Sequence, residues 1–151
     1  MAVQNPPAGY AGVIPYLCVA DGEAAIGWYQ RVLGAELVSR MDTQGKVGHA
    51  ELKISGGHFM LAGEFEGMNA SPGTLGGTSV QMLVYVEDPD AIHAKALAEG
   101  ATMTKPVADQ PWGDRMGGFT DPFGHGWSVA RHIEDVSPEE MTRRMKEAGF
   151  L

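Results

Sequence analysis

Val80–Pro89, with the sequence VQMLVYVEDP, is the stretch that decides the fold. An apolar run of strand-forming residues leads into Asp88 and Pro89, which are typical of the N-cap and the first position of a helix. The same order occurs at Val13–Asp21, VIPYLCVAD, whose aspartate lies 67 positions before Asp88. Each copy therefore predicts a strand that leads directly into a helix.

The rest of the chain repeats with nearly the same period. The Gly-His pairs at 57–58 and 124–125 are also 67 positions apart. Gly34 and Gly100, which we expect to end the two helices, are 66 positions apart. Three strand-like segments follow each glycine, at 35–41, 46–54 and 58–63 and then at 101–108, 113–120 and 126–131. The chain predicts an α+β fold of two tandem βαβββ modules.

Turn-forming and capping residues divide the chain. Residues 67–78 are rich in Gly, Pro and Ser, which is typical of a linker. Ser137, Pro138 and Glu140 form a capping-box pattern that begins a charged helix, which would cover a sheet edge or a partner subunit, or stay solvated. We expect one structural domain with these parts: N-terminal extension 1–12, first module 13–66, linker 67–78, second module 79–134 and C-terminal helix 135–151.

Composition and charge limit the class of function. The 151 residues have a formal net charge of −8 and no Lys/Arg run, which argues against nucleic acid or an anionic membrane as a partner. No apolar run approaches the roughly 18 residues of a membrane span, and the first residues do not resemble an export signal. Cys18 is the only cysteine and cannot form an internal disulfide, so we expect a cytoplasmic protein.

Several motifs together resemble the vicinal oxygen chelate superfamily, which includes glyoxalase I, extradiol dioxygenases and bleomycin-resistance proteins, and in particular its PhnB-like branch. The motifs are IPYLCVAD at 14–21, GHAELKI at 48–54, WGDR at 112–115, DPFGHGWS at 121–128 and DVSPEEM at 135–141. The resemblance implies that each module curls its sheet into a half-barrel with the helix outside. The concave faces of paired modules, within one chain or across a homodimer, would enclose a cavity for a small molecule.

The resemblance also implies where a metal ion would bind. In metal-dependent members each module supplies one ligand seven positions before the helix-capping Asp and another, usually Glu, on its fourth strand. In this chain the four positions are Ile14, Leu61, Gln81 and Ser128. Two of them offer no donor atom and two offer neutral donors, whereas a divalent ion usually needs several donors with a charge among them. We therefore predict no metal cofactor, which disfavours glyoxalase I and extradiol dioxygenase chemistry.

Strand alternation predicts which side chains would line the cavity. His49 and Glu51 share one face of the third strand, opposite its apolar face, and would form an acid–base pair within reach of a ligand. They would otherwise only line a solvated sheet face. The full set of candidate ligand-binding residues is Tyr16, His49, Glu51, Gln81, Trp112, Asp114 and Ser128, each of which has an ordinary structural alternative.

The histidines outside this set have simpler interpretations. Asp121–Gly124 predicts a tight turn, with Pro at its second and Gly at its fourth position, that mirrors residues 54–57. His125 is then a turn residue. His93 is expected on an exposed face of the second helix, and His132 lies past the last strand without an evident partner.

Three functions remain open. The first is metal-free binding of a small amphipathic or aromatic molecule, as in drug-sequestering resistance proteins. The second is a metal-dependent or atypical lyase, isomerase or dioxygenase in which His49 is the general base and Glu51 orients it or binds an ion. The third is a scaffold for protein–protein contact.

Overall fold

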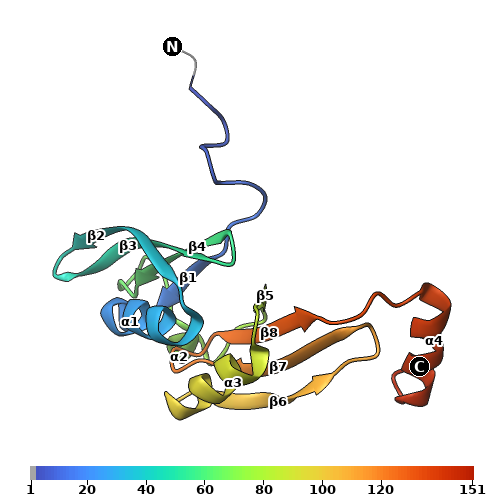
Figure 1. Cartoon of the computed structure of the whole chain (residues 1–151). Coiled ribbons are helices and arrows are strands. Elements are labelled where there is room, and N and C mark those ends of the chain that lie inside the picture. Colours follow the sequence, from blue (N-terminus) through green and yellow to red (C-terminus); the bar gives the residue numbers. More distant parts are fainter. Residues whose placement is uncertain (1–2) are drawn as a thin grey trace. The chain divides into compact units, whose positions relative to one another are not determined.

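The structure is a computed structural model, and it describes residues 3–151 (Figure 1). The chain divides into two compact units, of which one ends at Thr78 and the other begins at Ser79. Each unit contains a four-stranded mixed sheet and a helix after its first strand, and the second unit also carries the C-terminal helix. These elements confirm the predicted α+β fold of tandem βαβββ modules.

The first unit runs in the order strand, helix and three strands. Its main elements are β1 Tyr16–Val19, α1 Gly22–Leu33, β2 Glu36–Thr43, β3 Lys46–Ile54 and β4 Gly57–Gly63. The sheet order is β1-β4-β3-β2, and only the β1–β4 pair is parallel. Asp21 begins α1 because its carboxylate accepts a hydrogen bond from the Ala24 backbone N–H at 3.0 Å. Gly34 ends α1 in the left-handed conformation, with φ 66°.

The second unit repeats this order. Its main elements are β5 Gln81–Tyr85, α3 Pro89–Ala98, β6 Thr102–Asp109, β7 Asp114–Thr120 and β8 Gly126–His132. The sheet order β5-β8-β7-β6 corresponds strand by strand to that of the first unit. Asp88 accepts a hydrogen bond from the Ala91 N–H at 2.9 Å, so both helices begin at the predicted aspartates.

His93 corrects one expectation about α3. It is buried rather than exposed, and its Nε2 lies 3.0 Å from the carbonyl oxygen of Lys105 and 3.2 Å from that of Gly118. A Cβ added to Gly117 would lie 3.0 Å from the imidazole, so this glycine makes room for the ring. The imidazole therefore anchors α3 to the second sheet.

Alternation along the strands gives each sheet a helix-covered face and an open face. The helix-covered face is apolar in β1 and β5, where it contains Leu17, Val19, Met82 and Val84, all of them buried. On the other face, the exposed fractions of Tyr16, Leu83 and Tyr85 are 55%, 54% and 49%. We call the face with Tyr16 the open face of the first sheet and the face with Leu83 and Tyr85 the open face of the second sheet.

The linker contains a helix that the sequence did not predict, α2 at Pro72–Leu75. The carboxylate of Glu64 accepts hydrogen bonds from the Ser71 N–H at 3.0 Å and the Thr74 hydroxyl at 2.6 Å, and these bonds order the segment. A run of glycines and a single turn of helix leave no periodic apolar pattern, so only the structure could find it.

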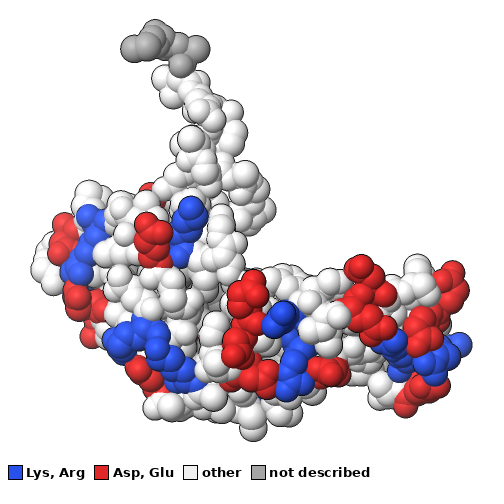
Figure 2. Space-filling model, viewed as in Figure 1, with Lys and Arg blue, Asp and Glu red and all other residues white. Residues whose placement is uncertain are grey.

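The C-terminal helix, α4 at Pro138–Glu147, is charged as predicted, and Ser137 caps it by accepting the Glu140 N–H at 3.2 Å. Arg144 pairs with Glu134 at 2.7 Å and with Glu140 at 2.8 Å, and Figure 2 shows acidic and basic side chains interspersed over this region. No residue of α4 is buried. Within residues 3–151, none of the helices has the length and apolar character that crossing a membrane requires.

Candidate functional site

A chain of hydrogen bonds crosses the open face of the first sheet. The Tyr16 hydroxyl on β1 lies 2.6 Å from Nδ1 of His49 on β3, and Nε2 of His49 lies 3.2 Å from Oε1 of Glu51. The Tyr10 hydroxyl donates to the other oxygen of Glu51, and the Tyr10 ring stacks on His58 with centroids 4.4 Å apart. The structure thus brings together three predicted residues, Tyr16, His49 and Glu51, and adds Tyr10.

The environment of these groups keeps Glu51 ionised and both phenols protonated. The hydrogen bond from Tyr10, followed by that from His49, lowers the pKa of Glu51. Partial burial, followed by the negative charge of Glu51, raises the pKa of Tyr16. An ionised Glu51 accepts the Nε2–H of His49, which leaves Nδ1 to accept the Tyr16 O–H. The arrangement can therefore move a proton between the exposed Tyr16 hydroxyl and His49.

Sequence reasoning missed Tyr10 because it lies in the N-terminal extension, outside the repeat. Strand alternation, which placed His49 and Glu51 on one face, applies only within a strand. Residues 3–15 form no strand. The only signal in the sequence is an aromatic residue in a short segment of small residues, Gly9-Tyr10-Ala11-Gly12. It does not indicate which surface the ring would contact.

A second polar cluster lies in the second unit. The carboxylate of Asp114, which is buried, accepts the Tyr85 hydroxyl at 2.9 Å and lies 2.9 Å from Nδ1 of His132. Nε2 of His132 lies 2.9 Å from Asp135. Hydrogen bonds to Asp135 and then Asp114 raise the pKa of His132. Asp114 is thus a structural link between the open face and the segment after β8, and His132 has partners that the sequence did not reveal.

The other predicted ligand-binding residues of the second unit make no hydrogen bond to this cluster in the structure. Trp112 lies in the turn before β7 rather than on a strand, which corrects the predicted face, and its ring meets Phe150 edge-on with centroids 6.4 Å apart. Gln81 is exposed at the start of β5. Ser128 on β8 is buried and pairs with Leu83. Both lie on the open face of the second sheet.

The two units differ in one hairpin. In the first, the two residues Ser55 and Gly56 join β3 to β4, and their positive φ values of 48° and 82° indicate a type I′ turn. In the second, residues 121–125 join β7 to β8. The predicted tight turn at Asp121–Gly124 is confirmed by the Gly124 N–H, which donates to the Asp121 carbonyl at 3.0 Å. Residues 54–57 form the corresponding turn between β3 and β4, but the first hairpin is one residue shorter. Eight residues separate Glu51 from its partner Met60, whereas nine separate Gly118 from Ser128.

This difference corrects the predicted equivalent of Ser128. Met60 pairs with Tyr16 in the first sheet as Ser128 pairs with Leu83 in the second, and Leu83 lies 67 positions after Tyr16. Leu61 is instead fully buried on the helix-covered face. Met60, not Leu61, therefore holds the fourth-strand position of the first unit, because a shift of one residue turns a side chain to the other face of a sheet.

Comparison with known families now decides the membership of the chain. A family model described as Glyoxalase/Bleomycin resistance protein/Dioxygenase superfamily matches residues 10–129. The chain belongs to this superfamily. Its paired βαβββ units are the feature that the sequence repeat predicted.

Relatives of this superfamily member share most of its length. An uncharacterized protein of Mycobacterium tuberculosis (strain H37Rv) is 36% identical over 154 residues, covering 99% of this chain and 88% of that protein. The crystal structure of TioX from Micromonospora sp. ML1 is 31% identical with a TM-score of 0.65, covering 82% of this chain and 100% of that one. A PhnB protein from Bacillus cereus, 21% identical with a TM-score of 0.56 over 80% and 99% of the two chains, shares the fold.

The four positions at which the resemblance expects metal ligands carry few donor atoms in this chain. With the corrected register the four positions hold Ile14, Met60, Gln81 and Ser128. Their side chains offer hydrocarbon, a thioether, an amide and a hydroxyl, without the carboxylate or imidazole that divalent ions prefer. In the described part of the chain, moreover, groups of three or more His, Cys, Asp or Glu side chains suited to a metal do not occur.

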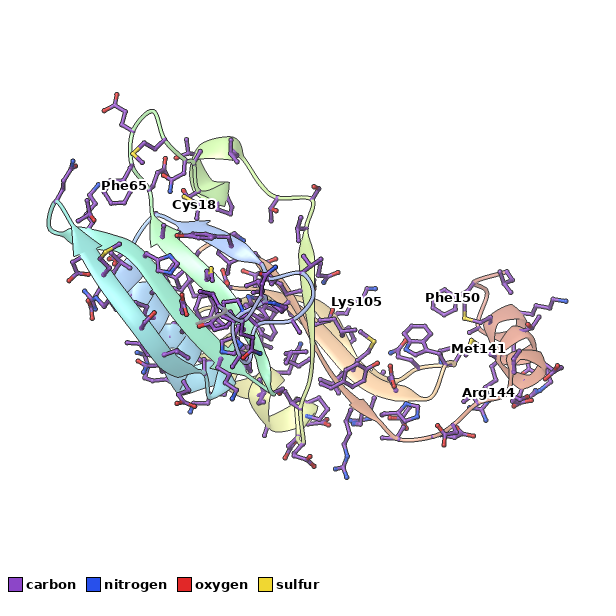
Figure 3. All side chains as sticks on the ribbon, turned by 90° about the horizontal axis from the view of Figure 1, so that it is seen from above. Cys18, Phe65, Lys105, Met141, Arg144 and Phe150 are labelled. Carbon is purple, nitrogen blue, oxygen red and sulfur yellow. The ribbon has the colours of Figure 1, made fainter. Side chains whose placement is uncertain are left out.

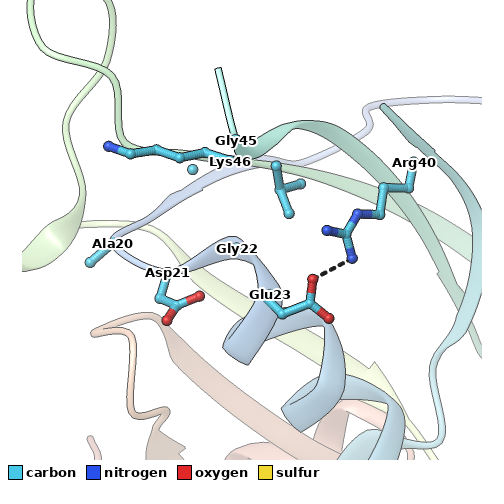
Figure 4. A pocket seen from close by; sticks show the side chains of 9 residues that line it. Ala20, Asp21, Gly22, Glu23, Arg40, Gly45 and Lys46 are labelled. Atoms are coloured by element: carbon cyan, nitrogen blue, oxygen red, sulfur yellow. Dashed lines mark ion pairs between the residues drawn. The ribbon is translucent and has the colours of Figure 1, made fainter. Parts of the chain in front are cut away.

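Two pockets of the first unit differ in chemistry. One, of about 310 Å³, lies at the N-terminus of α1 and contains Asp21, Glu23, Arg40 and Lys46. Figure 4 shows the ion pair across it, in which Arg40 and Glu23 approach to 2.5 Å. Because Asp21 caps α1 and Arg40 is paired, this pocket is stabilised by its own charges. The other pocket, of about 500 Å³, opens beside Tyr16 and is lined by both apolar and polar side chains.

Proposed function

We propose that this superfamily member binds a small amphipathic or aromatic molecule against the open faces of its sheets, without a metal ion. The observation that carries the proposal is the set of side chains at the four corrected positions, Ile14, Met60, Gln81 and Ser128. A ligand cavity formed by paired modules, a homodimer and a cytoplasmic location belong to the same proposal. The last of these rests on the single cysteine of the chain.

The exposed apolar surface supports this function. Tyr16 on the first sheet, and Leu83 and Tyr85 on the second, are each about half exposed. An aromatic ligand on either open face would gain roughly 25 cal/mol for each Å² of apolar surface removed from water. Aromatic side chains also provide contact area at a low cost in conformational entropy. The net charge of −8 favours a cationic over an anionic ligand during encounter.

Calorimetric titration tests the proposal. The panel contains metal-free bleomycin, a neutral aromatic heterocycle, an aromatic cation and an aromatic sulfonate, each added to protein purified without chelator. We expect saturable binding of at least one member, weakened by Tyr16→Ala and unchanged by Leu75→Ala, which removes an exposed apolar side chain on α2. Absence of binding across the panel would contradict the proposal.

One observation favours an alternative function, acid–base catalysis by an atypical lyase, isomerase or dioxygenase-like member. The relay from Tyr16 through His49 to Glu51 has the order of a reacting group, a base and an orienting carboxylate. The Tyr16 proton would pass to Nδ1 of His49, and the resulting phenolate would take a proton from the substrate. Glu51 would stabilise the imidazolium.

The alternative has its own test. The hemithioacetal of methylglyoxal and glutathione is the first substrate to assay, followed by catechols under oxygen. Turnover that Tyr16→Phe and His49→Gln both abolish, while calorimetric binding of the substrate is retained, would establish the enzyme. Turnover that both variants leave unchanged would remove these residues from the mechanism.

A further inference from the structure

The larger pocket of the first unit is built from three parts of that unit. Tyr16 and Ala62 come from the neighbouring strands β1 and β4, and Thr43, Gln44 and Gly48 come from the β2–β3 hairpin. The loop after β4 supplies the remaining lining residues, Phe65, Glu66, Met68 and Asn69. Its volume of about 500 Å³ falls in the range of small-molecule sites, roughly 300 to 1,000 Å³.

The loop after β4 is held in place by its own hydrogen bonds. The Asn69 side chain accepts the Phe65 N–H at 2.7 Å and donates to the Gly63 carbonyl at 3.0 Å. The Glu64 carboxylate accepts hydrogen bonds from residues of the following linker and is thereby directed away from the pocket lining. A loop that is already ordered spares a ligand the entropic cost of ordering it.

The lining selects for aromatic and positively charged ligands. Tyr16 and Phe65 supply rings, and Met68, which is 82% exposed, supplies a polarisable thioether beside them. Glu66 is the charged side chain among the nine lining residues, and no lysine, arginine or histidine is among them. Figure 3 shows Phe65 in this loop, and the Lys46 ammonium of the same unit lies 5.7 Å from its ring centroid, so a ligand would share this ring with a cation of the chain itself.

We propose that this pocket binds a small aromatic cation, with its ring against Tyr16 and Phe65 and its charge near Glu66. The inference rests on the proposed function and adds to it the class of the ligand and its place within the first unit. It also connects the pocket with the relay, because Tyr16 lines the pocket and its hydroxyl bonds to His49.

A matched pair of probes tests the inference on the full-length protein. N-methylacridinium is a permanent aromatic cation, and acridine is nearly the same shape but uncharged at mildly alkaline pH. Fluorescence titration should give tighter binding of N-methylacridinium to the native protein. Phe65→Ala should weaken this binding about tenfold, and Glu66→Gln should remove most of the preference for the cation.

Two control variants test whether a change in net charge, or the loss of any exposed apolar side chain, would alter binding in the same way. Glu36→Gln changes the net charge as Glu66→Gln does but lies on β2 outside the pocket lining, and it should leave the preference unchanged. Leu75→Ala removes an exposed apolar side chain and should leave the affinity unchanged. Circular dichroism confirms that each variant is folded.

The outcomes distinguish the inference from the function on which it rests. Binding of acridine or anilinonaphthalene sulfonate without binding of N-methylacridinium overturns the inference and leaves the proposed function standing. Cation binding that Phe65→Ala and Glu66→Gln do not alter also overturns the inference, because the ligand then lies elsewhere. Failure of every probe, bleomycin included, overturns both.

Discussion

Asp121 holds together the turn that joins β7 to β8. Its buried carboxylate accepts the N–H groups of Phe123 and His125 and the indole N–H of Trp127, each at 2.9 Å. We predict that Asp121→Ala lowers the free energy of unfolding by about 3 kcal/mol, because two buried donors and one partly buried donor lose a charged acceptor. Urea unfolding measures the loss.

Asp88→Ala is the matched control for this prediction. Asp88 accepts one backbone hydrogen bond, from Ala91 at 2.9 Å, at an exposed helix start, and its loss should cost about 1 kcal/mol. Equal losses in the two variants would show that the turn at Asp121 has no stabilising role beyond that of an ordinary cap.

Tyr10 controls the charge of Glu51. We predict that Tyr10→Phe raises the pKa of Glu51 toward its ordinary value of 4.5, because the hydrogen bond from Tyr10 is the largest cause of the lowered pKa. A carbon-13 NMR titration of the Glu51 carboxyl group measures this directly. An unchanged pKa would show that the His49 contact alone sets it.

The same substitution has a pH-dependent effect on stability. A folded-state pKa below the unfolded value stabilises the protein above the unfolded value, and the contribution is lost as pH falls through the folded-state pKa. The difference in stability between the native protein and Tyr10→Phe should therefore be largest at neutral pH and shrink below about pH 4.5. A difference that grows on acidification would contradict this assignment.

The position of a residue could be predicted from the sequence where strand alternation or helix-capping chemistry applied to it. Strand alternation placed His49 and Glu51 on one face, which the structure shows, and the helix caps at Asp21 and Asp88 followed from local chemistry. Leu61 was assigned to the wrong position because one additional residue in a hairpin reverses the face, and the repeat period alone cannot reveal it.

At the scale of elements, Gly113 ties the turn before β7 to the segment after β8. Its carbonyl accepts the N–H groups of Ile133 at 2.9 Å and Glu134 at 3.1 Å, and its φ is 93°. A Cβ there would lie 2.0 Å from the Glu134 carbonyl oxygen. We predict that Gly113→Ala destabilises the protein by about 3 kcal/mol, because backbone strain and the clash add.

Gly45→Ala separates these two causes. Gly45 has a similar positive φ of 73° in the β2–β3 turn, but its Cβ would meet nothing within 4 Å. Its substitution should cost about 1 kcal/mol from the backbone conformation alone. A similar loss in both variants, measured by thermal unfolding, would show that the contact with Glu134 can relax.

Elements were predictable when they were long and bounded by caps. The strand at Lys46–Ile54 has the predicted bounds, and the helix at Pro138–Glu147 begins at the predicted capping box. The strand predicted at 113–120 begins one residue later, at Asp114, because Gly113 with its positive φ belongs to the turn before β7. Long-range hydrogen bonds such as that of Gly113 with Glu134 leave no local pattern.

At the scale of the whole molecule, the two units share a topology but not their polar groups. Glu51 and Gly118 occupy equivalent positions, since each pairs with the fourth-strand residue of its own sheet, Met60 and Ser128. The Glu51 network therefore has no counterpart in the second unit, which instead carries Asp114 with Tyr85 and His132. The repeat predicts the fold of both units, while their chemistry depends on residues that differ between them.

The response of the whole protein to divalent ions follows from the four side chains at the metal positions of the superfamily. We predict that Zn²⁺, Ni²⁺ and Mn²⁺ do not raise the unfolding temperature of the tag-free protein. A bound ion present at 100 times its Kd would add about 2.7 kcal/mol to the free energy of unfolding.

Gln81→His combined with Ser128→Glu is the matched variant, since both positions lie on the open face of neighbouring strands β5 and β8. It should gain a Zn²⁺-dependent rise, because it supplies an imidazole and a carboxylate in place of two neutral donors. A stoichiometric ion in the native protein, found by mass spectrometry of protein purified without chelator, would contradict the prediction and would require donors other than Ile14, Met60, Gln81 and Ser128.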